Sequence, residues 1–207
     1  YSDITVFSFH PVKIITTGEG GMAVTNNESL ARRLTLFRSH GITSDMDQME
    51  PRPLDEIWNY QQIELGFNYR MTDIQAALGL SQLGKLHGFV ERRNEIADRY
   101  RALLVDLPVV LPPEPDFGFR HGYHLFPVRV QDRRKAFDGL RSSGIDVQVH
   151  YVPMHHHPVN QDLGFRVGDL SACDAIYEEL ISLPIFPTLT EVQQDRVVET
   201  LAGLVSS

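Results

Sequence analysis

Apolar side chains recur at three- and four-residue intervals in five stretches of the chain, the spacing that places them on one face of an α-helix. We therefore predict amphipathic helices over residues 28–38, 72–104, 133–143, 169–180 and 191–204. Asn26 and Asn27 can cap the first helix, and Thr190 can cap the last. At the start of the second helix, Thr72 and Gln75 have the spacing of a capping box, in which each side chain accepts a hydrogen bond from the other's backbone amide.

Other stretches have the composition and length of β-strands. They are rich in β-branched and aromatic residues, and they cover residues 3–9, 123–130 and 145–151. We expect the first of these strands to be buried and to end in a turn at His10-Pro11. Strands followed by helices predict an α/β fold.

Two segments lack a clean period. Residues 43–62 contain the single tryptophan, Trp58, and segments this long are usually functional or mobile. Residues 43–62 could form a lid beside a ligand. The alternative is a hairpin or irregular insertion that packs Trp58 onto the body of the protein. Residues 107–115 contain four prolines and predict an extended linker, which we take as a domain boundary.

The overall composition is that of a globular chain, with 42% hydrophobic and 22% charged residues in 207. A net charge of -8 argues against nucleic acid or an anionic membrane as the partner. The single cysteine, Cys173, excludes an internal disulfide and suits a reducing compartment. No apolar run approaches the ~20 residues of a membrane span, so we predict a cytoplasmic location.

Lys13 is the candidate nucleophile of this sequence. It lies just past the first predicted strand, between apolar Val12 and Ile14. Loss of hydration favours the neutral amine, which can attack an aldehyde. Ser8, five residues earlier, carries a hydroxyl that can hold a phosphate. The alternative is an ordinary surface lysine in a loop.

The segment around this lysine resembles the DegT/StrS family of sugar aminotransferases, which depend on pyridoxal 5′-phosphate (PLP). Members carry a Ser-Phe-(His or Asn)-x-x-Lys segment and then a Gly-Glu-Gly-Gly strand, which correspond here to residues 8–13 and 18–21. Further similar segments run to the last helix: Arg38-Ser39-His40-Gly41, Gly66-Phe67-Asn68-Tyr69-Arg70-Met71, Tyr123-His124, His150-Tyr151-Val152-Pro153 and Leu183-Pro184-Ile185-Phe186-Pro187. The sequences of residues 8–13 and 147–151 most resemble those of the family branch that serves pseudaminic acid synthesis.

The resemblance implies PLP-dependent transferase fold type I, the aspartate aminotransferase-like fold. Residues 1–106 correspond to the C-terminal part of the large PLP-binding domain with its connecting helix, and residues 107–207 to the small C-terminal α/β domain. Family members are roughly twice as long, so we expect a C-terminal portion whose other half supplies the phosphate loop and the pyridinium aspartate. Without that half we expect an exposed apolar face and altered assembly. One alternative is therefore a fragment that is inactive by itself.

The resemblance also implies the roles of three residues in cofactor binding. Lys13 is the Schiff-base lysine of PLP, and Ser8 and Asn68 bind its phosphate. In the family this asparagine reaches the cofactor of the neighbouring subunit, which implies a homodimer with shared active sites. The alternative for Asn68 is support of a turn.

The implied reaction is ping-pong amino transfer. Glutamate gives up its amino group and leaves as 2-oxoglutarate, and a 4-keto nucleotide sugar receives the group. The branch of the family named above indicates UDP-4-keto-6-deoxy-N-acetylhexosamine, for cell-surface polysaccharide or glycan biosynthesis. A noncatalytic sensor or binding module, as some relatives are, remains an alternative. A dehydrating branch has histidine in place of the lysine, so Lys13 argues against it.

A second polar cluster contains Tyr151 and the run His155-His156-His157. By resemblance this segment lies on the sugar side of the site, so Tyr151 and His155 are the candidate substrate contacts; an exposed polar loop is the alternative. We predict no metal here. Successive residues on a strand point to opposite faces, and the chain has neither a second cysteine nor a His-Glu-x-x-His helix.

Overall fold

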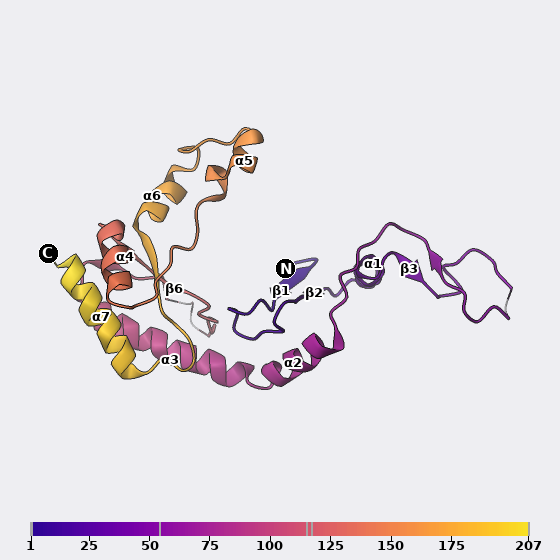
Figure 1. Ribbon diagram of the computed structural model, residues 1–207, viewed down its shortest axis with the longest axis horizontal. Coiled ribbons are helices and arrows are strands. Elements are labelled where there is room, and N and C mark those ends of the chain that lie inside the picture. Colours follow the sequence, from indigo (N-terminus) through magenta and orange to yellow (C-terminus); the bar gives the residue numbers. More distant parts are fainter. Residues whose placement is uncertain (1, 54, 115, 117, 207) are drawn as a thin grey trace. The chain divides into compact units, whose positions relative to one another are not determined.

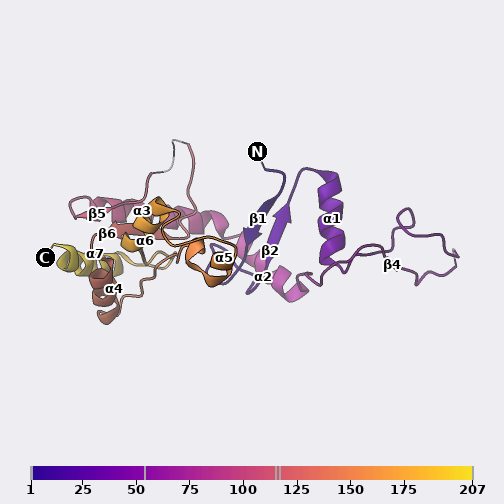
Figure 2. The same ribbon diagram turned by 90° about the horizontal axis from the view of Figure 1, so that it is seen from above.

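The computed structural model describes residues 2–53, 55–114, 116 and 118–206 (Figures 1 and 2). The chain divides into two compact units, Tyr1–Leu86 and His87–Ser207. None of the helices within the described ranges combines the length and hydropathy that crossing a membrane requires. Pro115, the last proline of the predicted linker, lies outside the described residues.

The first unit begins with two strands, β1 (Thr5–Ser8) and β2 (Gly21–Val24), paired antiparallel with Thr5 opposite Val24 and Ser8 opposite Gly21. The position of the strand predicted over residues 3–9 is confirmed. Its predicted burial is wrong, because every residue of β1 and β2 is exposed. The two strands pair only with each other in the described structure, so their apolar side chains face solvent.

Helix α1 (Glu28–Arg38) begins where the sequence predicts, and Asn27 Oδ1 caps it by accepting the Leu30 backbone N–H at 3.2 Å. Two short strands follow, β3 (Ile42–Thr43) and β4 (Gln61–Gln62), which pair antiparallel. The segment between them is therefore a hairpin, as one of the two alternatives has it, with residue 54 outside the described part. The packing of Trp58 onto the body, which belongs to the same alternative, does not occur in this chain, since the Trp58 side chain is 73% exposed. A role as a lid stays a prediction.

The long helix predicted over residues 72–104 is divided into α2 (Asp73–Leu83) and α3 (Leu86–Leu104). The capping box at Thr72 and Gln75 is confirmed. The break falls at Gly84, the C-cap of α2, whose N–H donates to the carbonyls of Leu80 and Gln82. Glycine has a low helix propensity, so the helix ends there although the apolar stripe continues.

The first unit buries few of its side chains. Among its described residues only Thr17 and Gly41 are buried. Large apolar side chains of β1, β2 and α2 are exposed: Val6, Phe7, Met22, Ile74, Leu80 and Leu83. Side chains of this kind gain stability only when another surface covers them, which agrees with the expected exposed apolar face.

The second unit contains a three-stranded antiparallel sheet in the order β5 (Val109–Val110), β6 (Phe126–Val130), β7 (Leu180–Leu183). Strand β6 lies within the strand predicted over residues 123–130. The strand predicted over residues 145–151 is wrong: only Gln148 makes a bridge, to Ser182. The partner of β6 along Phe126–Arg129 is instead β7. The sequence did not predict β7 as a strand.

The rest of the second unit is mainly helical, and a 3₁₀ helix precedes α5. Their bounds are α4 (Arg133–Ser142), η1 (Met154–His156), α5 (Pro158–Asp162), α6 (Ser171–Glu179) and α7 (Glu191–Val205). The predicted helices at 133–143, 169–180 and 191–204 are thus confirmed. The core of the unit is made by α3, α4, α7, β6 and β7 together with the segment after α4.

Helix α3 contributes directly to this core. The ring of Tyr100 stacks on Phe126 at 5.1 Å between centroids, and Gln194 Nε2 of α7 donates to the Ile96 carbonyl at 3.0 Å. The helix that the sequence assigns to the end of the first domain therefore packs within the second compact unit. The domain division between residues 106 and 107 stays a prediction about the whole enzyme.

Helix α7 provides a test of its predicted cap. Thr190 Oγ1 accepts the Gln193 backbone N–H at 3.3 Å, and Gln193 Oε1 accepts the Thr190 N–H at 3.0 Å. We expect Thr190→Ala to lower the free energy of unfolding by about 1 kcal/mol, because the first turn loses its side-chain acceptor. Thr200→Ala, within the same helix, is the control and should change less in urea titrations followed by circular dichroism. Equal losses would contradict the role of the cap.

Candidate active site

The loop between β1 and β2 carries the predicted nucleophile. Lys13 is half-buried and closes a turn in which its backbone N–H donates to the His10 carbonyl at 2.9 Å. Ser8 is the last residue of β1, and its exposed hydroxyl oxygen accepts the His10 N–H at 3.5 Å. Ser8 and Lys13 are therefore both linked through His10, at the end of β1 and in the turn that follows.

The far side of this loop is anchored on α2. Buried Thr17 donates its backbone N–H to Phe9 at 3.0 Å and its hydroxyl to Glu19 at 2.7 Å. A Cβ on Gly79 of α2 would come within 2.8 Å of the Thr17 methyl group, so only glycine allows this close approach. Gln75 Nε2 adds a hydrogen bond to the Glu19 carbonyl at 3.0 Å. These contacts limit the freedom of the loop that holds Lys13.

Asn68 lies on another segment of the first unit. It forms an antiparallel bridge with Ser39, and its neighbours donate backbone hydrogen bonds to the end of α1, from Phe67 to Phe37 and from Tyr69 to Arg38. The residue is exposed. The structure thus places Asn68 in the same unit as Lys13, four residues before the Thr72 cap of α2, and its contact with a phosphate stays a prediction.

Gly66 is the residue on which the position of the Asn68 segment depends. A Cβ there would lie 2.2 Å from the Gly41 nitrogen and 2.5 Å from the His40 carbonyl carbon, and backbone atoms cannot yield as a flexible side chain can. We expect Gly66→Ala to displace the segment and to lower the free energy of unfolding by about 1–3 kcal/mol, the usual cost of overpacking.

The control for this change is Gly88→Ala in α3, where an added Cβ meets nothing within 4 Å. Alanine is the better helix former, so this variant should be as stable as the original protein or slightly more so. Both variants can be compared by urea unfolding. A Gly66→Ala protein with unchanged stability would show that the segment moves freely.

The second unit carries the predicted substrate contacts. Tyr151 is 65% exposed and lies beside His150, whose Nδ1 is 2.9 Å from the Ser182 hydroxyl of β7. The rings of His150 and Tyr151 meet edge to face at 4.7 Å. Tyr151 is thus held next to the sheet with its side chain available to solvent. Its contact with a substrate stays a prediction.

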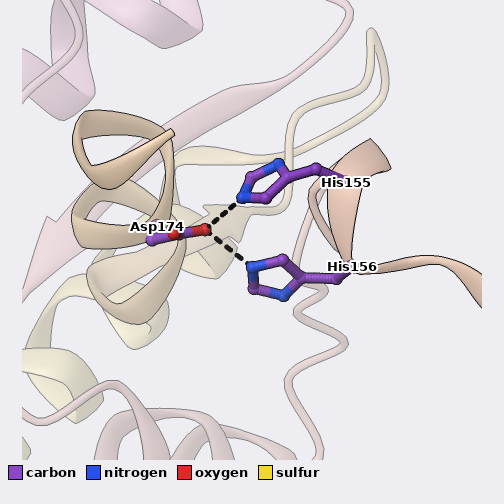
Figure 3. A group of neighbouring side chains, drawn as sticks. All are labelled: His155, His156 and Asp174. Atoms are coloured by element: carbon purple, nitrogen blue, oxygen red, sulfur yellow. Dashed lines mark hydrogen bonds and ion pairs between the residues drawn. The ribbon is translucent and has the colours of Figure 1, made fainter. Parts of the chain in front are cut away.

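His155, by contrast, is only 3% exposed. Its Nε2 lies 2.7 Å from Asp174 Oδ1, and His156 Nε2 lies 2.6 Å from the same oxygen (Figure 3). The expectation that adjacent histidines point apart is wrong, because they belong to the 3₁₀ helix η1 and not to a strand. A direct contact of His155 with a substrate remains a prediction, and its present partner is a carboxylate.

The charge of this carboxylate is stabilised by its partners. Desolvation alone raises the pKa of Asp174, but hydrogen bonds from the two imidazoles and from the Gly168 amide outweigh it. The pKa of Asp174 is therefore held below its usual value. The sequence did not predict that Asp174 and His156 join His155 in one cluster. Asp174 lies on α6, 18 residues after His156, and no spacing motif links it to η1.

Comparison with known proteins gives a consistent result. Residues 1–202 match the model of the DegT/DnrJ/EryC1/StrS aminotransferase family. The chain is 31% identical to the spore coat polysaccharide biosynthesis protein SpsC of Bacillus subtilis, over 98% of this chain and 54% of that protein. It spans about half the length of the curated relatives that it matches.

Solved structures agree with the family match. A Streptococcus pneumoniae protein, Spr1654, described as a sugar aminotransferase and solved in its PMP form, is similar with a TM-score of 0.90 and 28% identity, over 99% of this chain and 53% of that one. Helicobacter pylori PseC, an aminotransferase involved in the biosynthesis of pseudaminic acid, is similar with a TM-score of 0.86 and 30% identity, over 100% of this chain and 54% of that one. The predicted fold class, fold type I, is confirmed by these similarities.

Proposed function

Since this chain belongs to the DegT/DnrJ/EryC1/StrS aminotransferase family, we propose that the protein containing it is a PLP-dependent enzyme that moves an amino group from glutamate to a keto sugar. The observation that carries the proposal is the position of Lys13. It is a half-buried residue of a loop fixed to α2, and the resemblance of residues 8–13 to the family's Ser-Phe-(His or Asn)-x-x-Lys segment assigns it the role of the Schiff-base lysine.

The donor set of the loop and the Asn68 segment fits PLP. The amine of Lys13 suits the cofactor's aldehyde, and the Ser8 hydroxyl and the Asn68 amide suit its phosphate. When bound, PLP supplies an electron sink for the carbon that loses its proton. Lys13 would hold the cofactor covalently at rest. Once released as an amine, its Nζ would take the proton from the α-carbon of glutamate and deliver it to the carbon that carried the cofactor's aldehyde, so that glutamate leaves as 2-oxoglutarate.

The acceptor that we propose is a 4-keto nucleotide sugar, UDP-4-keto-6-deoxy-N-acetylhexosamine. The similarity to PseC, an aminotransferase of pseudaminic acid biosynthesis, supports this sugar, and the similarity to SpsC supports a role in polysaccharide biosynthesis. Tyr151 and His155 would define the sugar side of the site. Tyr151 is exposed and available for direct contact with the sugar. His155 is buried and bonded to Asp174, so it would reach the sugar only from its place in η1.

We further propose that the enzyme is a homodimer with shared active sites, located in the cytoplasm. Exposed apolar side chains on β1, β2 and α2 support a covered surface in the assembled protein. Asn68 is exposed and so free to face the cofactor of a second subunit. The thiol of Cys173 is free, which suits a reducing compartment.

Borohydride reduction of the full-length protein with PLP, followed by peptide mapping, tests the cofactor. We expect the label on Lys13. Incubation with glutamate and the keto sugar then tests the reaction, and an amino sugar and 2-oxoglutarate should form. A label on Lys13 without amino transfer to any keto sugar would identify a binding module, and a label elsewhere would overturn the proposal.

A further inference from the structure

Three side chains of the second unit converge on one point: His155 and His156 from η1, and Asp174 from α6 (Figure 3). We propose that they bind a divalent transition-metal ion, with Zn²⁺ the best match, and that the ion fastens η1 to α6. The proposal does not depend on the amino-transfer reaction, since it concerns only how this part of the second unit is held together.

The ligand atoms have the right type and separation. Two imidazole nitrogens and one carboxylate oxygen form a set that suits Zn²⁺, and all three atoms lie within 4.8 Å of one another. In a tetrahedral site with bonds near 2.1 Å, ligand atoms are about 3.4 Å apart. The present spacings of 2.7 and 2.6 Å to Asp174 Oδ1 therefore need to open by about 0.7–0.8 Å each. A water molecule would complete the four ligands.

Contacts around the three side chains also fit a metal site. The Gly168 N–H donates to Asp174 Oδ2 at 2.9 Å and so leaves Oδ1 directed toward the histidines. The His156 ring packs edge to face against Tyr177 of α6 at 5.7 Å. Outer contacts of this kind orient metal ligands in known sites.

Burial and access are both suitable. The side chain of His155 is 3% exposed, whereas those of His156 and Asp174 are 17% and 20% exposed. One ligand is thus desolvated, and an ion can still enter from the side of the other two. Bound there, the ion would close the stretch between η1 and α6, which contains α5 and the exposed Gly164 and Gly168, and would reduce the conformational freedom of that stretch.

The test is metal titration of the full-length protein after treatment with a chelator. We expect calorimetry to show one Zn²⁺ bound per chain, and Co²⁺ to give the visible absorption of a tetrahedral site. Asp174→Asn should weaken Zn²⁺ binding by more than about 100-fold, because loss of a ligand exceeds the 10–100-fold effect of an outer contact. Asparagine keeps one oxygen that can accept from the imidazoles, but its NH₂ group replaces Oδ2 and loses the bond from the Gly168 N–H, so the stability of the metal-free variant is measured alongside by urea unfolding.

His157→Ala is the matched control, since His157 is the exposed third member of the histidine run and follows η1. It should bind Zn²⁺ as tightly as the original protein, and Zn²⁺ should raise the melting temperature of this control but not of Asp174→Asn. Absence of Zn²⁺ binding would overturn the proposal. So would binding that depends on His157 and not on Asp174, which would show chelation by the exposed histidine run.

Discussion

Replacing Lys13 with alanine in the full-length protein is expected to lower kcat for amino transfer by at least about 10²–10⁴-fold. The variant loses both the covalent hold on the cofactor and the amine that moves the proton of the donor. Glutamate and the keto sugar should still bind, because the proposed contacts of the sugar are made by Tyr151 and His155. The measurement is steady-state production of 2-oxoglutarate with both substrates present, together with borohydride labelling, which should disappear.

Lys85→Ala is the matched control for this experiment. Lys85 is an exposed lysine of the same unit, between α2 and α3, and its loss should change neither activity nor labelling. Lys13→Arg keeps a positive charge but cannot form the covalent bond, so it should be as inactive as Lys13→Ala. Normal turnover by Lys13→Ala would remove the basis of the proposed function.

Local signals in the sequence predicted local structure well. Asn27, Thr72 and Thr190 all cap the helices that they precede, because a capping side chain bonds to amides only two or three residues away. The Ser8–Lys13 segment was also readable, since strand, turn and lysine occupy a few consecutive residues. Interactions within such a short span do not depend on how the rest of the chain folds.

Structure that depends on distant partners was not predictable in the same way. Strand β7 follows α6 directly. The sequence assigned Leu180 to the preceding helix and the other three residues of β7 to no element. Residues 180–183 form a strand because they pair with β6, some fifty residues earlier along the chain. Residues 145–151, which the sequence favoured, do not take that place. The burial of β1 was overestimated for the same reason, since an apolar strand is buried only if another element covers it.

The candidate site shows the same division. Sequence similarity pointed to Lys13, but it gave no indication that Gly79 of α2 supports the lysine's loop through Thr17. It also singled out the histidine run, and the assumption of strand geometry then led to the expectation that the side chains diverge. The 3₁₀ turn of η1 reverses that expectation, because it lets adjacent rings reach the one carboxylate of Asp174.

The stability of the second unit should depend most strongly on Phe126. This side chain of β6 is 0% exposed, stacks on Tyr100 of α3 and lies at 6.3 Å from the ring of Tyr123. Phe126→Ala removes these contacts and leaves a cavity between the sheet and α3. We expect the free energy of unfolding to fall by about 3–5 kcal/mol, as measured by urea titration with circular dichroism.

Phe119→Ala is the control, because Phe119 is the same residue type seven positions earlier and is 73% exposed. Its loss should change the free energy of unfolding by less than about 0.5 kcal/mol. If the two variants were equally stable, α3 would not belong to the core of the second unit. A large loss of unfolding free energy for Phe126→Ala alone would support the packing of α3 on the sheet of the second unit through Tyr100. The sequence had assigned this helix to the first domain.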